Sequence, residues 1–129
     1  MLTTYLAVAF GSALGGASRY AVVRAVQGRT RGAFPLGTLV VNISGALLAG
    51  LLMGLLTAHG AVSGSAQALL IIGFCGSYTT VSSFSLETLS LIQTGHRGLA
   101  ALNVAGSFLG SIAGAIGGLA FIQIAIAGP

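Results

Sequence analysis

Charged side chains are scarce in this sequence. Its 129 residues include five arginines, no lysine, no aspartate and a single glutamate, Glu87. A soluble domain has about a quarter charged residues, so the composition excludes that class. Hydrolytic and redox enzymes need paired carboxylates, nucleophile and base pairs or clusters of metal ligands. One acid and two histidines supply none of these, and we predict that the chain is not an enzyme.

The sequence also has one cysteine, Cys75, so no disulfide can form within the chain. Four of the five arginines lie in two short segments, residues 24–34 and 95–98. Placed between apolar runs, they bear on membrane orientation and on lipid headgroups rather than on nucleic acid. We therefore expect membrane lipid, and no nucleic acid, among the partners.

Apolar residues are abundant, at 55 % of the chain. They gather in four runs, each long enough to cross a hydrocarbon core of roughly 30 Å. This pattern predicts an all-α integral membrane protein, multi-pass in the plasma membrane, with a single domain over residues 1–129. The expected spans are residues 2–23, 36–58, 66–93 and 99–127.

A polar, glycine-punctuated stretch interrupts the third run. It extends from Gly73 to Glu87 and reads GFCGSYTTVSSFSLE. A bilayer tolerates a broken helix only where the freed backbone groups face protein or water, and the two new helix ends present carbonyls to a cation and N–H groups to an anion. The density of hydroxyls favours an ion site over a kink that only lets helices approach closely.

Polar residues also occur in the second and fourth runs. Thr38 and Asn42 are four residues apart and share one helix face. Asn103, Ser107 and Ser111 have the same spacing, beside glycines at 106, 110, 114 and 118 that indicate tight helix packing. Asn42 is either a bond between helices or an ion contact. The stripe from Asn103 is either satisfied internally or lines a polar track.

Arg19 and Glu87 are charged residues within expected spans. Arg19 either snorkels to the interface beside Tyr20 or attracts anions to a vestibule. Glu87 lies about two helical turns beyond the break, where a carboxylate is a functional candidate by default. Pairing with Arg97, or a position at the membrane interface, is equally compatible with the sequence.

Three motifs carry a resemblance to a known family. The chain reads GGASRY from Gly15, GTLVVNISG from Gly37 and the interrupted stretch from Gly73. In order and separation these resemble the signatures of the CrcB/Fluc fluoride channels. The resemblance implies a fluoride-selective channel that exports fluoride down its gradient and lowers its cytoplasmic concentration. It also implies four helices per subunit, an antiparallel dual-topology dimer with two pores, and a structural sodium ion at the interface.

The resemblance assigns roles to single positions. The backbone carbonyls of Gly76 and Thr79 would bind sodium, Asn42 would be the pore asparagine and Phe84 the second of two pore phenylalanines. Fluoride is small and strongly hydrated, and hydroxyls, amide N–H groups and aromatic ring edges suit the replacement of its water. The other positions that the resemblance places along or beside the pore are Thr38, Ser82, Ser83, Glu87, Ser107 and Ser111, with Arg19 at the vestibule.

Two features depart from the family pattern. Val81 replaces the first pore phenylalanine, because the motif reads TTVSSF where the family has TTFSTF. The two arginine-bearing loops fall on one side of a four-span chain, which favours insertion with both loops in the cytoplasm and both termini outside. These departures support an alternative to the antiparallel homodimer, in which the chain is one partner subunit of a heterodimeric channel.

Other functions are less compatible with the sequence. A small multidrug-type transporter also has four spans, but it needs a carboxylate in the first span to couple protons to cationic drugs, and residues 1–34 contain no acid. A non-conducting structural subunit held together by the glycine stripes is the remaining alternative.

Overall fold

The computed structural model describes residues 1–30, 32–59 and 64–127, which form helices joined by short turns. Four stretches of these residues are long and apolar enough to cross a membrane. This confirms the predicted class, an all-α protein with several membrane spans. The helices, in chain order, are α1 (Leu2–Gln27), α2 (Leu36–His59), α3 (Gly64–Gln67), η1 (Ala68–Cys75), α4 (Gly76–Tyr78), α5 (Val81–Gln93) and α6 (Arg97–Ala127).

Some helix ends lie beyond the predicted spans. α1 continues to Gln27, and within this extension Arg24 donates a hydrogen bond to Tyr20 Oη at 2.9 Å and lies over the tyrosine ring. α6 begins at Arg97, before the predicted start at Leu99. A hydropathy pattern marks only the apolar part of a helix, so it misses charged residues that continue the helix toward the headgroups.

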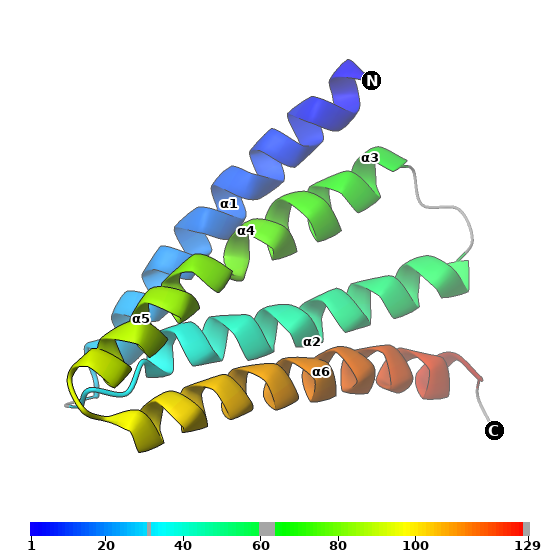
Figure 1. The fold of residues 1–129 in the computed structure, drawn as a ribbon. Helices are drawn as coiled ribbons and strands as arrows, with labels where there is room; N and C mark the ends of the chain where they lie inside the picture. Colours follow the sequence, from blue (N-terminus) through cyan, green and yellow to red (C-terminus); the bar gives the residue numbers. More distant parts are fainter. Residues whose placement is uncertain (31, 60–63, 128–129) are drawn as a thin grey trace.

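The helices form two groups that splay apart (Figure 1). α2 packs along α6, while α1 packs along η1 and α4. α5 departs from α1 and packs on α6 instead. The turns after α1 and after α5 lie at one end of the molecule, and the N-terminus and the end of α6 lie at the other (Figure 1). Arg24, Arg29 and Arg97 therefore belong to the same end; Arg31 lies outside the described residues.

Glycines let α2 and α6 approach closely, as their spacing predicts. A Cβ atom at Gly50 would collide with the Ala115 carbonyl, and one at Gly118 with the Leu47 carbonyl. Because lipid is as apolar as leucine, this close van der Waals packing takes the place of the hydrophobic effect in holding the helices together.

Glycines also let α1 approach the third span closely. A Cβ atom at Gly11 would collide with the Leu69 carbonyl, and one at Gly15 with the Phe74 carbonyl. The facing segment is η1, a π-helix, whose turns are wider than those of an α-helix. These contacts fix the first half of the third span against α1, up to the point where the helix is interrupted.

Candidate functional site

The third span loses its helical conformation at Thr79 and Thr80. Thr79 has φ −80° and ψ 161°, and Thr80 has φ −151° and ψ 123°, so both are extended. α5 then begins at Val81, with Thr80 as its N-cap: Thr80 Oγ1 accepts a hydrogen bond from the Ser83 N–H at 3.2 Å. The polar stretch that the sequence singles out is thus where this backbone change lies.

Asn42 of α2 satisfies the backbone at this point. The Thr80 N–H donates to Asn42 Oδ1 at 2.8 Å, and Asn42 Nδ2 donates to the Thr80 carbonyl at 3.0 Å. One side-chain amide therefore replaces the lost helical acceptor of the Thr80 N–H and adds a donor to the Thr80 carbonyl, in a bilayer that offers no water. Of the two interpretations of Asn42, the structure supports the bond between helices. Its second Nδ2 hydrogen is not used by this pair, and that donor is what an ion contact would need.

The first half-helix ends at the interruption, and its last carbonyls lose their helical donors, those of Gly76 and Thr79 among them. The partner of the Gly76 carbonyl in a continuous helix would be the Thr80 N–H, which binds Asn42 instead. The partner of the Thr79 carbonyl would be the Ser83 N–H, which binds Thr80 Oγ1. Carbonyl oxygens at a half-helix C-terminus suit a hard cation such as sodium, so the residues present fit the predicted ligand set. No cluster of three His, Cys, Asp or Glu side chains occurs in the described part of the chain.

A groove of about 370 Å³ runs beside the interruption, between α2, α5 and α6. Five predicted pore residues line it, among them Val81 at the position of the missing phenylalanine. Ser82 and Ser83 lie beside it, with their hydroxyls 3.3 and 3.1 Å from Thr80 Oγ1. The predicted pore residues in the groove wall are Asn42, Val81, Phe84, Ser107 and Ser111.

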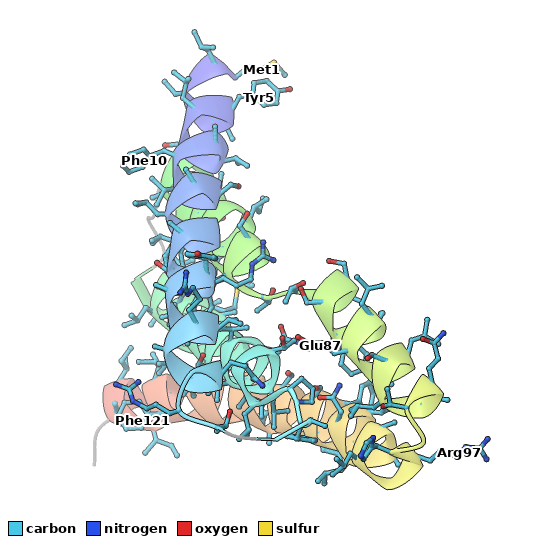
Figure 2. The ribbon with its side chains drawn as sticks, turned by 90° about the vertical axis from the view of Figure 1, so that its left-hand side faces the viewer. Met1, Tyr5, Phe10, Glu87, Arg97 and Phe121 are labelled. Carbon is cyan, nitrogen blue, oxygen red and sulfur yellow. The ribbon has the colours of Figure 1, made fainter. Side chains whose placement is uncertain are left out.

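Glu87 lies in the wall of a second cavity, of about 420 Å³, near the turns that follow α1 and α5. Its Oε1 accepts a hydrogen bond from Thr38 Oγ1 at 2.8 Å. Figure 2 shows Glu87 between the helices and Arg97 at the outer edge of the molecule. Among the alternatives for Glu87, pairing with Arg97 is therefore wrong, since the carboxylate binds α2 instead.

Buried side-chain polar atoms occur on α5 and α6, the helices that contribute Glu87 to the cavity and Ser107 to the groove. Three such atoms in the described residues have no hydrogen-bond partner: Glu87 Oε2, Asn103 Oδ1 and Ser107 Oγ. Asn103 is 0 % exposed and Ser107 is 8 % exposed. They are one turn apart on α6, and Ser107 also lines the groove. An unsatisfied buried polar group costs about 1–3 kcal/mol, so each of these atoms is suited to a polar binding partner.

The family resemblance assigns no pore role to Asn103, but the structure places it among these buried polar groups. Its Nδ2 donates to Thr88 Oγ1 at 2.9 Å, and Thr88 Oγ1 donates to the Phe84 carbonyl at 2.7 Å. The single hydroxyl proton of Thr88 is thus engaged, which directs the amide nitrogen of Asn103 toward Thr88 and leaves its oxygen unpartnered. The four-residue spacing from Asn103 to Ser111 is the sequence signal that indicates this position.

Comparison with known proteins supports the family resemblance that the sequence motifs indicate. Residues 6–119 match the family model described as CrcB-like protein, Camphor Resistance (CrcB). The chain belongs to the CrcB family. A relative from Nitrobacter winogradskyi, named fluoride-specific ion channel FluC, is 38 % identical over 122 residues, which cover 95 % of this chain and 97 % of the relative.

Two further CrcB relatives have the same name. The protein from Thermus thermophilus is 48 % identical over 107 residues, covering 82 % of this chain and 85 % of the relative. One from Coxiella burnetii is 46 % identical over 113 residues, covering 85 % and 90 %. CrcB membership, together with four candidate spans, makes the chain a multi-pass membrane protein of an ion-channel family, not an enzyme.

Proposed function

We propose that the chain is a subunit of a fluoride-selective channel that lets fluoride leave the cytoplasm down its gradient. The observation that carries this proposal is the set of buried polar atoms without partners, Glu87 Oε2, Asn103 Oδ1 and Ser107 Oγ, in a largely apolar helix bundle. Glu87 lines the cavity and Ser107 lines the groove, and in this proposal the ion path joins the two past Asn103. CrcB relatives named for fluoride conduction support the choice of ion.

The chemistry of the groove suits a small, strongly hydrated anion. The hydroxyls of Ser107 and Ser111, the free Nδ2 hydrogen of Asn42 and the ring edge of Phe84 are donors or positive edges that replace water. The groove's lining residues, all of them described, include no arginine or lysine. Conduction needs binding weak enough for release, and a fixed positive charge there would hold the ion.

A second subunit completes the pathway in this proposal. The groove is open along α5, where Val81 is 77 % exposed and Leu86 is 69 % exposed. A polar path that is open at one side of the subunit needs cover, because lipid in contact with the path offers the ion no polar partner. We infer an antiparallel homodimer, in which a second copy of the chain covers α5.

The heterodimer remains the second candidate, because two observations favour it. Val81 leaves the groove with one of the two expected phenylalanines. The described arginines outside the spans gather at one end of the molecule (Figure 1), which favours a single insertion orientation. In that case the antiparallel partner would be a related chain with the opposite charge bias.

The Gly76 and Thr79 carbonyls are the proposed ligands of a structural sodium ion. Sodium would supply a positive charge for the two carbonyls that the interruption deprives of helical donors. Because each subunit offers two carbonyls, the matching pair from an antiparallel partner would complete the ligand set and hold the two interruptions together.

Fluoride efflux from liposomes that contain the purified chain tests the function. We expect rapid efflux of fluoride, measured with a fluoride electrode, and no efflux of chloride. Asn42→Asp should lower the flux about 100-fold or more, because it places a fixed negative charge in the groove. Phe84→Ile should lower it about tenfold through loss of the ring edge.

Phe121→Ile is the matched control, since Phe121 is exposed on α6 (Figure 2) and outside the groove lining. No efflux from a folded preparation would contradict the homodimeric channel. Efflux restored by a related second chain would then favour the heterodimer. Retained dimerisation without any flux, alone or with a partner, would favour a structural subunit.

A further inference from the structure

Three residues on one face of α1 contact backbone carbonyls of the third span. Gly11 and Gly15 are four residues apart and lie against the carbonyls of Leu69 and Phe74. Arg19 is the next residue at that spacing, and its Nη1 donates to the Thr79 carbonyl at 3.3 Å. Each step of four residues along α1 is thus matched by a step of five along the third span.

The two glycine contacts determine where the arginine reaches. They hold the α1 backbone against η1, whose π-helical turns account for the five-residue step from Leu69 to Phe74. Arg19, four residues further along this face, lies at the interruption. Here Thr79 is extended, and its carbonyl does not bind the Ser83 N–H. Arg19 supplies a donor to that carbonyl.

The depth of Arg19 makes this contact significant. Arg19 is eight residues before the end of α1 at Gln27, about 12 Å along the helix at 1.5 Å per residue, and it lies inside the predicted apolar span of residues 2–23. A guanidinium at such a depth needs a partner. The single acid of the chain, Glu87, binds Thr38 instead, and the C-terminal end of the first half-helix, with its negative dipole, takes the role of the partner.

We propose that Arg19 sets the cation affinity of the interruption, because its guanidinium and a bound metal cation share the Thr79 carbonyl. This inference rests on the sodium site proposed above. The arginine neutralises the carbonyl end when no metal is bound, and it repels a metal cation that binds there. Arg19 therefore keeps sodium binding weaker than the carbonyls alone would make it.

A sodium titration of the full-length purified protein tests the inference. Sodium chloride replaces N-methylglucamine chloride at constant ionic strength, and the thermal unfolding temperature and the dimer fraction are measured. Arg19→Gln keeps an N–H donor and removes the charge. We expect its half-maximal sodium concentration to fall about tenfold or more, since two like charges within a few ångströms repel strongly at low dielectric.

Matched variants separate charge from structure. Arg19→Lys keeps the charge and should retain a sodium midpoint close to that of the unmodified chain. Arg24→Gln removes a charge from the same helix, where Arg24 binds Tyr20, and should leave the midpoint unchanged. Arg19→Met keeps the apolar stem and replaces Arg19→Gln in the comparison if the latter does not fold.

The outcomes distinguish this inference from the sodium site itself. A lower midpoint in Arg19→Gln or Arg19→Met, but not in Arg19→Lys, would support the role of Arg19. Equal midpoints in all variants, or a higher midpoint without the charge, would refute that role and leave the sodium site standing. If neither the unmodified chain nor any variant responded to sodium, the sodium site would be wrong.

Discussion

The two halves of the third span differ in what surrounds them. In the first half, Ala68, Gly73 and Cys75 of η1 are buried, and α1 lies against the backbone. In α5, all of whose residues are described, Leu91 is the one buried side chain. The first half is therefore held by the rest of its own subunit, whereas most of the second half is not.

The difference separates anchoring from ion handling. The first half ends in freed carbonyls, which suit a cation. The second half begins with N–H groups and hydroxyls, and it contributes Phe84 and Glu87 to the groove and the cavity. A half-helix that keeps Glu87 half-buried and leaves Val81 and Leu86 exposed has a free face that is suited to an interface with a second subunit. Substitutions should thus affect folding in the first half and conduction in the second.

The largest expected effect is on the anchored half. Gly15→Ala places a Cβ atom against the Phe74 carbonyl, whereas a Cβ atom at the neighbouring Gly16 meets no atom within 4 Å. We expect Gly15→Ala to destabilise the protein by about 3 kcal/mol through overpacking against backbone. Gly16→Ala should be neutral or stabilising by up to about 1 kcal/mol. Thermal unfolding in detergent measures both, and equal unfolding temperatures would contradict the anchoring role.

An intermediate effect is expected where α5 binds α2. Thr38→Val removes the hydroxyl that donates to Glu87 Oε1. Since Oε2 has no partner, neither carboxylate oxygen of Glu87 then accepts a side-chain hydrogen bond. We expect a loss of about 2 kcal/mol of stability and a clear fall in fluoride flux.

Thr57→Val is the control on the same helix, because Thr57 donates only to carbonyls of its own helix, those of Met53 and Gly54. Its stability and flux should match those of the unmodified chain. Thr38→Val with undiminished flux would show that the Glu87 cavity is not on the ion path.

The smallest effect is expected at the exposed start of α5. Val81→Phe restores the missing aromatic ring at a groove position that is 77 % exposed in the single chain. Stability should hardly change, and fluoride flux should rise about threefold to tenfold, given the energy of an added ring edge. Leu86→Phe, at another exposed position of α5, is the control. Equal flux in Val81→Phe and in the unmodified chain would make Val81 a neutral substitution.

Much of the architecture was predictable because bilayer thickness and hydropathy determine spans directly. The class of fold and the polar stretch at Gly73–Glu87 follow from composition alone. The partners within the site do not. Asn42 and Thr80 are 38 positions apart, and no local spacing indicates that a side-chain amide would satisfy that backbone.

The contact of Arg19 was hidden for a geometric reason. If the third span were a regular α-helix, four residues of α1 would match four residues of the third span. The contact face of α1 would then not reach the Thr79 carbonyl. The π-helical turns supply the extra residue in the step from Leu69 to Phe74, and this brings Thr79 within reach of the Arg19 side chain. Hydropathy does not distinguish a π-helix from an α-helix, so the sequence left snorkelling and a vestibule as the alternatives for Arg19. Its vestibule role stays a prediction.

The pairing of Asn42 with Thr80 has a consequence for biogenesis. During synthesis the second span precedes the third, so the amide of Asn42 is already in the bilayer when the interrupted segment arrives. Without it, the Thr80 N–H would enter lipid unsatisfied, at a cost of several kcal/mol. We therefore expect stable insertion of the third span to require the second, so that the order of the spans along the chain affects how the protein assembles.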